Sequence, residues 1–268
     1  MIKLIASDMD GTLLNDRKEL PGDFFEVFDE LERRRIKFTV ASGRSFDAVA
    51  HLFPEEYRTR LDFICDNGAN VIHEGKQVSV TPLDRPTFEQ LIRACEDIGG
   101  LRILVCAGRG TYHLTADAEF SAEIAKYYKN HIPCDDLLSV DDVIYKLAVC
   151  DMKGTQQHAK PAIDAIFGDR LNVQVSGPIW MDVMGAGVSK GSALRALGKH
   201  LGISADDTMA FGDFYNDADM LKYAGWSFAM ENGNPDIKRM TRFLARSNNE
   251  NGVLRAIRQY ALQEDSIK

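Results

Sequence analysis

The chain has 268 residues, of which 45% are hydrophobic and 27% charged, and its formal net charge at pH 7 is −8. This length allows two domains, and the composition is typical of a globular protein with a hydrated surface. The acidic balance argues against a nucleic-acid-binding surface, which is usually basic. No apolar stretch approaches the roughly 20 residues that a membrane helix needs, and the first residues do not resemble a signal peptide. We therefore expect no nucleic-acid partner and no membrane association.

The cysteines are scattered along the chain, and none of them forms a Cys-x-x-Cys pair. Their odd number and irregular spacing favour reduced thiols over a disulfide framework or a zinc site. This usage predicts a cytoplasmic protein. The five residues are Cys65, Cys95, Cys106, Cys134 and Cys150.

The first predicted elements alternate between strand and helix. Leu4 to Ala6 is a short apolar run typical of a buried parallel strand, and residues 21–35 carry apolar side chains at helical spacing. Parallel strands joined by a helix are the expected arrangement. The elements that follow are a strand at 37–41, a helix to about residue 52, a strand at 62–65 and a hairpin at 71–80 with its turn at Glu74 and Gly75.

From about Pro82 the pattern changes, and hairpin-like strand pairs alternate with single helices. Such a pattern predicts an α+β layer with antiparallel strands, inserted into the first unit. We expect helices at 86–98, 118–130 and 156–167, and strands at 102–107, 111–114, 144–151, 171–176 and 179–184.

The first pattern then resumes, with helices at 189–201, 235–240 and 252–262 and strands at 208–211, 226–230 and 243–245. The predicted fold is therefore α/β, with a doubly wound, Rossmann-like parallel-sheet core and an inserted α+β domain. We assign residues 1–82 and 184–268 to the core and residues 83–183 to the inserted domain.

Two carboxylates, Asp8 and Asp10, follow the first strand, and the chain then turns at Gly11. Ligands of open α/β sheets bind outside the carboxyl ends of the strands. Like charges so close repel each other, and a divalent cation such as Mg²⁺ would relieve that repulsion. An ordinary Asp-Gly turn explains the pair equally well when it is considered alone.

Polar residues also follow other predicted strands or begin helices. Ser42 and Gly43 can present a hydroxyl and a backbone N–H to an anion, although helix capping by Ser42 or Ser45 is the simpler reading. In a doubly wound sheet these positions can converge on one edge, where they suit phosphoryl transfer with an Asp nucleophile. The further positions are Lys190, at the start of a helix, and Asp213, Asn216 and Asp217, after a strand.

These motifs, in this order and spacing, resemble the four motifs of the haloacid dehalogenase (HAD) superfamily. The inserted block is similar to the C2 cap of its Cof-type phosphatases, so the resemblance covers nearly the whole chain. It implies an HAD core with a C2 cap and a Mg²⁺-dependent phosphatase that acts on small phosphorylated metabolites, with sugar phosphates as the leading class. The motifs are Asp8-Met9-Asp10-Gly11-Thr12, Ser42-Gly43-Arg44, Lys190-Gly191 and Gly212-Asp213-Phe214-Tyr215-Asn216-Asp217, supported by Asp66-Asn67-Gly68-Ala69.

The resemblance also implies roles for the catalytic residues. Asp8 would be the nucleophile and a metal ligand, and Asp10 the general acid and base, with its backbone carbonyl on the metal. Asp213 would be the second metal carboxylate, and Lys190 would neutralise Asp8 and the phosphoryl charge.

The remaining motif residues would bind phosphate or support the catalytic groups. Ser42, Gly43 and Asn216 would contact the phosphoryl group, and Arg44 would contact either substrate or solvent. Two supporting roles are implied: Thr12 would donate a hydrogen bond to Asp10, and Asp217 would orient Lys190 or a metal-bound water.

One departure from the family pattern follows Met230, where Glu231-Asn232-Gly233-Asn234 replaces the usual Asn-Ala. It lies beyond the catalytic motifs, so we expect a changed loop and retained activity. In the inserted domain, residues near 108–110 and 177–182 are candidate pocket residues, although structural hairpins explain them equally simply. Neither the physiological substrate nor the oligomeric state follows from the sequence.

Alternative functions stay open at this point. A phosphomutase or phosphotransferase of the same superfamily would pass the phosphoryl group to an alcohol instead of water. A phospho-Asp signalling receiver uses a similar sheet, but the insertion of roughly 100 residues disfavours that class. A P-loop ATPase is disfavoured because residues 189–192 lack the glycine pattern of that loop.

Overall fold

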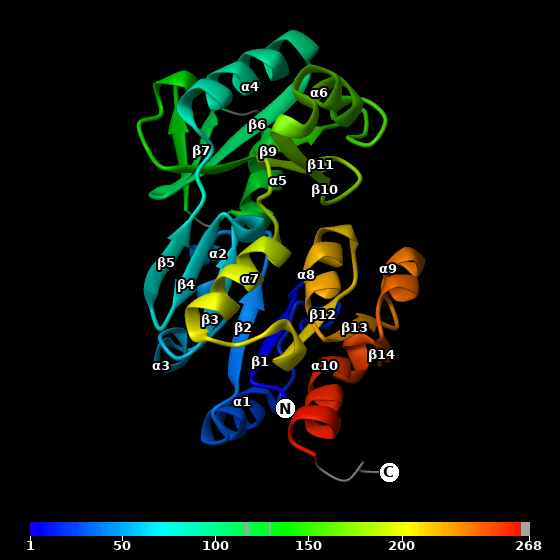
Figure 1. Cartoon of the computed structure of the whole chain (residues 1–268). Helices are drawn as coiled ribbons and strands as arrows, with labels where there is room; N and C mark the ends of the chain where they lie inside the picture. The colour runs from blue at the N-terminus through cyan, green and yellow to red at the C-terminus, as the bar shows by residue number, and fades with distance from the viewer. Residues whose placement is uncertain (116–117, 129, 264–268) are drawn as a thin grey trace.

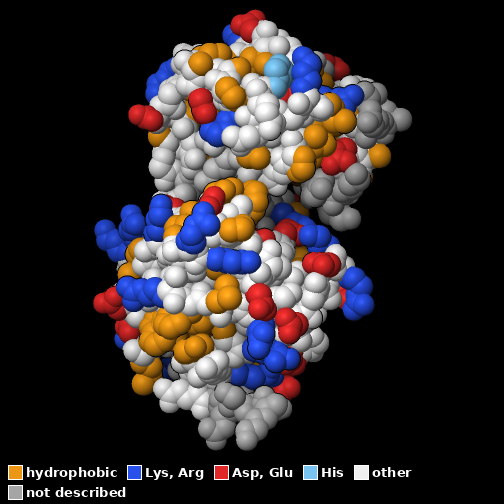
Figure 2. Space-filling view, turned by 90° about the vertical axis from the view of Figure 1, so that its right-hand side faces the viewer, with side chains coloured by type: hydrophobic (Ala, Val, Ile, Leu, Met, Phe, Trp, Pro, Cys, Tyr) orange, Lys and Arg blue, Asp and Glu red, His pale blue; other side chains and the backbone are white. Residues whose placement is uncertain are grey.

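The computed structural model describes residues 1–115, 118–128 and 130–263. Two β-sheets lie one above the other in the view of Figure 1, and the N-terminus and the last described helix lie with the lower sheet. Figure 2 shows the same arrangement from the side, as two lobes that meet at a narrowed waist. The lower lobe holds the predicted core, and the upper lobe holds the inserted segment.

In the described residues the core sheet has eight strands in the order β14-β13-β12-β1-β2-β3-β4-β5. The strands from β14 to β3 are parallel, and the hairpin β4–β5 adds an antiparallel edge. The strands are β1 (Leu4–Ser7), β2 (Lys37–Ala41), β3 (Asp62–Cys65), β4 (Asn70–His73), β5 (Lys76–Val80), β12 (Thr208–Gly212), β13 (Trp226–Met230) and β14 (Phe243–Ala245).

Helices cover both faces of this sheet because its central strands are apolar on both sides. In β1, Ile5 packs in one cluster with side chains of α1, α2 and α10, whereas Leu4 and Ala6 pack in a second cluster with α7, α8 and α9. The core is therefore doubly wound. Its helices are α1 (Phe24–Arg33), α2 (Phe46–Ala50), α3 (Glu55–Arg58), α7 (Lys190–Leu201), α8 (Ala218–Tyr223), α9 (Pro235–Met240) and α10 (Gly252–Ala256).

The second sheet has six described strands in the order β10-β11-β9-β6-β7-β8. Its pairs are antiparallel except for β7 and β8. Helices α4 (Arg85–Ile98) and α6 (Ala159–Phe167) pack on one face, and α5 (Ala118–Tyr127) packs on the other. The strands are β6 (Leu101–Ala107), β7 (Gly110–Leu114), β8 (His131–Cys134), β9 (Ile144–Asp151), β10 (Leu171–Val175) and β11 (Trp180–Gly185).

The structure confirms the fold class and most predicted elements, and it adds elements that the sequence did not indicate. Strand β8 and helix α3 were not predicted, and the last helix continues from α10 into a π-helical turn at Ile257–Ala261. Residues 116–117 and 129, within or beside the predicted helix at 118–130, lie outside the described residues. The domain division remains a proposal, and its second boundary falls inside β11.

All five cysteines are free thiols, as predicted. Across the part of the chain that the structure describes, no helix is both long enough and apolar enough to cross a membrane.

Candidate active site

The predicted site residues meet because β1, β2 and β12 are neighbours and end at the same edge of the core sheet. Ser7 of β1 lies in register with Val40 of β2 and Phe211 of β12. The residues that follow these strands therefore come together at one edge. They include Asp8 after β1, Ser42 after β2 and Asp213 after β12.

Lys190 is the centre of this cluster and is fully buried. Its Nζ donates a hydrogen bond to Asp8 Oδ1 at 2.6 Å and another to Asp217 Oδ1 at 2.8 Å. Ser189 places the lysine in the first turn of α7 because its side chain caps that helix in a capping box with Ser192. Although burial opposes it, the carboxylates of Asp217 and Asp8 raise the pKa of Lys190, so the ammonium stays charged.

Asp8, Asp213 and Asp217 form an acidic group in which each residue offers an oxygen within 4.8 Å of the others. One lysine cannot neutralise three carboxylates. Burial and neighbouring carboxylates raise the pKa of Asp8, and burial together with Asp217 raises that of Asp213 to about 6. A hard divalent cation such as Mg²⁺ would remove this electrostatic strain, so the donor set fits the metal that the sequence predicts.

Gly11 allows the two motifs to approach each other. Its φ is +82°, a left-handed conformation that favours glycine, and a Cβ at this position would lie 2.6 Å from Asp213 Oδ2. Asn232 donates from Nδ2 to the Gly11 carbonyl at 2.7 Å, so the segment that departs from the family pattern supports this turn.

Asp10 points to different partners from Asp8. Arg44 donates to both of its oxygens, from Nε at 2.8 Å and from Nη2 at 2.6 Å, and Lys18 donates to Oδ1 at 2.8 Å. Burial opposes the effect of these cations, but Arg44 and Lys18 together lower the pKa of Asp10. Asp10 is therefore an anion in this arrangement. Lys18, in the loop after β1, gave no signal in the sequence.

Thr12 supports a different carboxylate from the one expected. Its hydroxyl donates to Asp213 Oδ1 at 3.2 Å, and the predicted hydrogen bond to Asp10 is absent from the described contacts. The turn at Gly11 brings residue 12 towards the β12 motif, whereas the cations on Asp10 hold that side chain elsewhere. Asp217 matches its predicted contact with Lys190 and also accepts from the backbone N–H groups of Asp213 and Phe214.

Ser42, Gly43 and Asn216 lie beside one another through a shared neighbour, Asn67. Asn216 Nδ2 donates to Asn67 Oδ1 at 3.4 Å, and a Cβ on Gly43 would lie 3.1 Å from the same oxygen. Ser42 is buried, and its Oγ accepts from the backbone N–H of Arg44 at 3.1 Å. The segment therefore forms a compact polar turn, which is held to Asn67 by a hydrogen bond from the Asn67 N–H to the Ser42 carbonyl at 3.1 Å.

A buried polar network joins this turn to the upper lobe. Lys146 of β9 donates from Nζ to the Gly43 carbonyl at 2.8 Å and to Asp182 Oδ1 at 2.6 Å. Asp182 of β11 also accepts from Asn67 Nδ2 at 2.9 Å. The available sequence signal was one charged residue in the interior of each of two largely apolar strands, and sequence reasoning missed Lys146.

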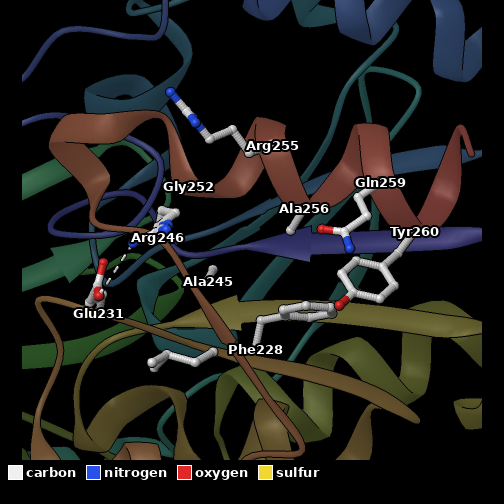
Figure 3. Close-up of a pocket in the computed structure, with 10 residues that line it drawn as sticks. Phe228, Glu231, Ala245, Arg246, Gly252, Arg255, Ala256, Gln259 and Tyr260 are labelled. Carbon is white, nitrogen blue, oxygen red and sulfur yellow. Dashed lines mark ion pairs between the residues drawn. The ribbon is translucent and has the colours of Figure 1, made fainter. Parts of the chain in front are cut away.

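The candidate pocket residues of the inserted domain lie in three different environments. Gly108 and Gly110 line a cavity of about 320 Å³ between the lobes, and Asp182 belongs to the buried network. Arg109 pairs with Asp142 at 3.3 Å on the surface. A separate cavity of about 270 Å³, shown in Figure 3, lies between β14 and the last helix. Glu231 and Arg246 pair there at 3.9 Å, and none of the predicted site residues lines it.

The fold and the site define a doubly wound α/β enzyme core with a carboxylate–lysine centre and an inserted α+β cap. The haloacid dehalogenase-like hydrolase family model matches residues 5–257. The 5-amino-6-(5-phospho-D-ribitylamino)uracil phosphatase YbjI of Escherichia coli (strain K12) is 31% identical over 258 residues, which are 96% of this chain and 95% of that protein. The chain therefore belongs to the haloacid dehalogenase-like hydrolase family, which confirms the predicted family and the prediction of an enzyme.

Two further proteins extend this likeness. The HMP-PP phosphatase of Klebsiella pneumoniae (strain 342) is 28% identical over 239 residues, with 89% of this chain and 87% of that protein covered. The crystal structure of SMU.1108c from Streptococcus mutans UA159 superposes with a TM-score of 0.90 at 28% identity, covering 98% of this chain and 100% of that one.

Proposed function

We propose that the protein is a Mg²⁺-dependent phosphomonoester hydrolase that acts on small phosphorylated metabolites in the cytoplasm through an aspartyl-phosphate intermediate. Sugar phosphates are the first substrate class to test. Both curated relatives described above are named as phosphatases, and YbjI is named for a phosphorylated ribityl compound, which is consistent with this class.

The observation that carries the proposal is the position of Lys190 between Asp8 and Asp217, with Asp213 beside them. A phosphoryl group in transfer carries charge on its equatorial oxygens, so catalysis depends on positioning and electrostatic stabilisation. The site supplies a carboxylate nucleophile, a permanent cation and a metal-binding acidic group within one cluster. Asp8, Asp213 and the backbone carbonyl of Asp10 would hold the Mg²⁺, which supplies Lewis-acid stabilisation of the phosphoryl oxygens.

In the proposed first step, an Asp8 carboxylate oxygen attacks phosphorus, and the P–O bond to the leaving alcohol breaks. The Asp10 carboxyl gives its proton to the departing oxygen. In the second step, Asp10 takes a proton from water, the water oxygen attacks phosphorus, and the Asp8 carboxylate and inorganic phosphate are released. Lys190 stabilises the negative charge in both steps, and Asp217 keeps its ammonium in place.

Asp10 must be protonated when the alcohol leaves, yet its pKa is lowered while Arg44 and Lys18 are paired with it. The substrate phosphoryl group carries up to two negative charges and competes for the same arginine. We therefore assign Arg44 to the phosphoryl group in the substrate complex. Its transfer from Asp10 to substrate would raise the pKa of Asp10 at the moment when a proton is needed.

The other motif residues act by binding and orientation. Ser42 Oγ–H, the Gly43 N–H and Asn216 Nδ2–H would donate to the phosphoryl oxygens, and Thr12 would hold Asp213. The cap would exclude water from the site while substrate is bound.

The test is phosphate release from a panel of phosphomonoesters that includes para-nitrophenyl phosphate, hexose and pentose phosphates and nucleotides. The proposal predicts release that requires Mg²⁺, stops with EDTA and is lost in Asp8→Asn. Release that persists in EDTA would reject the metal requirement. Analysis of the products with an added acceptor sugar separates hydrolysis from phosphotransfer, because a transferase would form a new sugar phosphate.

A further inference from the structure

Asp66 is a buried carboxylate that the proposed chemistry does not use. It follows β3 directly, its side chain is 1% exposed, and neither carboxylate oxygen has a hydrogen-bond partner among the described residues. Buried carboxylates are normally paired or hydrogen-bonded, because an isolated one is costly to desolvate. Burial raises the pKa of Asp66 to about 7, and the attraction of Lys146 only partly offsets this effect. A carboxylate without a partner in the protein is suited to accept hydrogen bonds from a bound ligand.

Asp66 lines the cavity of about 320 Å³ that lies between the lobes. A second carboxylate, Asp47, lines the same cavity, and its described lining contains no lysine or arginine. Lys146 lies close enough to influence Asp66, but its ammonium already donates to Asp182 and to the Gly43 carbonyl. The described lining of the cavity is therefore acidic and contains no cation of its own. Its other lining groups include the amides of Asn70, Gln77 and Asn130 and the ring of Tyr145.

This cavity shares a wall with the turn formed by residues 42–44, to which the proposed function assigns the phosphoryl group. The Asp66 N–H donates to the Arg44 carbonyl at 3.0 Å, and the Asn67 N–H donates to the Ser42 carbonyl at 3.1 Å. Ser45, the residue after Arg44, lines the cavity itself. The wall of the cavity is thus bonded directly to the turn to which the proposed function assigns the phosphoryl group.

We propose that this cavity receives the nitrogen-bearing part of the substrate and that Asp66 accepts hydrogen bonds from an amine or amino group on the leaving alcohol. The proposal rests on the proposed function and narrows its substrate class to amino-substituted phosphomonoesters. A neutral amino group supplies hydrogen-bond donors, and an ammonium supplies both donors and the positive charge that the described lining lacks. The ammonium also favours the ionised form of Asp66, which only accepts hydrogen bonds. A neutral hydroxyl would donate one hydrogen bond without compensating the charge.

The experiment compares matched esters that differ at one amine. Calorimetry measures binding of glucosamine 6-phosphate against glucose 6-phosphate, and of pyridoxamine 5′-phosphate against pyridoxine 5′-phosphate, in the Asp8→Asn background so that turnover does not interfere. A charge-assisted hydrogen bond predicts that the amine-bearing member of at least one pair binds about ten- to a hundredfold more tightly.

Asp66→Asn is the decisive variant, because Asn has the same shape and tolerates the φ of +51° found at this position. In this variant the dissociation constants of the amine-bearing ester and its matched partner should differ by no more than about twofold. Asp62→Asn is the matched control, because Asp62 lies at the opposite end of β3, is equally buried and also has one oxygen without a partner among the described residues. It should retain the preference.

Equal binding within both pairs would overturn the proposal without any variant, even if Asp66→Asn does not fold. A preference that survives in Asp66→Asn would also overturn it, because another group would then recognise the amine. Hydrolysis of para-nitrophenyl phosphate by the wild-type protein tests the proposed function separately. Amine preference without such hydrolysis would reject the hydrolase and keep the binding site, whereas hydrolysis without preference would reject only the binding site.

Discussion

Lys146 and Asp182 form a buried ion pair within the upper lobe, and each of them is also hydrogen-bonded to the lower lobe, through the Gly43 carbonyl and Asn67. Removal of Lys146 gives a prediction whose size follows from the structure. Both side chains are almost fully buried, at 3% and 6% exposed, and Lys146 Nζ lies 2.6 Å from Asp182 Oδ1. Lys146→Met leaves Asp182 as a buried anion with only Asn67 as its described partner. Breaking a buried pair in this way costs about 3–5 kcal/mol. With about 2–4 °C per kcal/mol for chains of this size, the melting temperature should fall by roughly 6–20 °C.

The double variant Lys146→Met/Asp182→Leu tests the reason for that loss. An apolar pair of similar volume often replaces a buried ion pair at little cost, so the double variant should recover most of the stability. Lys160→Met is the control in the same lobe, because Lys160 pairs with Asp164 at a partly exposed site, where the loss should stay below about 1 kcal/mol. Scanning calorimetry measures all three variants. The reasoning is refuted if Lys146→Met is no worse than Lys160→Met, or if the double variant is no better than Lys146→Met.

Three further predictions concern the core. Lys190→Met should lower turnover of para-nitrophenyl phosphate by at least about 10²–10³-fold, because the charge that develops on the phosphoryl group loses its cation. Lys199→Met, on the exposed face of the same helix, should leave turnover unchanged. Comparable rates in the two variants would contradict the role of Lys190 in charge stabilisation. Mg²⁺ at 100 times its dissociation constant should stabilise the fold by about 2.7 kcal/mol, as measured by thermal denaturation. Asp213→Asn should abolish most of that stabilisation, and an equal stabilisation of the wild type and the variant by Mg²⁺ would exclude Asp213 as a ligand. Because burial raises the pKa of Asp66 to about 7, its folded state keeps a proton that the unfolded state releases near pH 4, so stability should fall as pH rises between these values. We therefore measure the free energy of unfolding by urea denaturation at pH 5 and at pH 8. The difference between the two pH values should be smaller in Asp66→Asn than in the wild type, by up to about 2.6 kcal/mol, and an unchanged difference would show that Asp66 does not titrate there.

The parts of the site that the sequence predicted are those fixed by local pattern. Apolar runs that end in polar residues located the ends of β1, β2 and β12, and parallel pairing then brought those ends together. Lys190 was predictable because a Ser-capped helix start fixes its place in the first turn of α7.

The parts that could not be predicted depend on contacts between distant segments. Thr12 donates to Asp213, 201 positions away, and the local sequence does not specify that partner. Strand β8 contains Pro133 and pairs in parallel with β7, so its structure comes from tertiary pairing rather than strand propensity. Lys146 is a buried cation within an apolar strand, and only the position of Asp182 on the neighbouring strand explains it.

The measurement that tests the central claim most directly is detection of a phosphoryl group on Asp8. The protein is mixed with para-nitrophenyl phosphate and Mg²⁺ and quenched in acid, and the Asp8 peptide is analysed by mass spectrometry. In Asp10→Asn, where slow phosphorylation should continue without hydrolysis, we predict that this peptide gains the mass of one phosphoryl group. The wild-type protein should show less of it, and Asp8→Asn none. Phosphate release by the wild-type protein with an unmodified Asp8 peptide in every sample, or near-normal release by Asp8→Asn, would contradict Asp8 as the nucleophile.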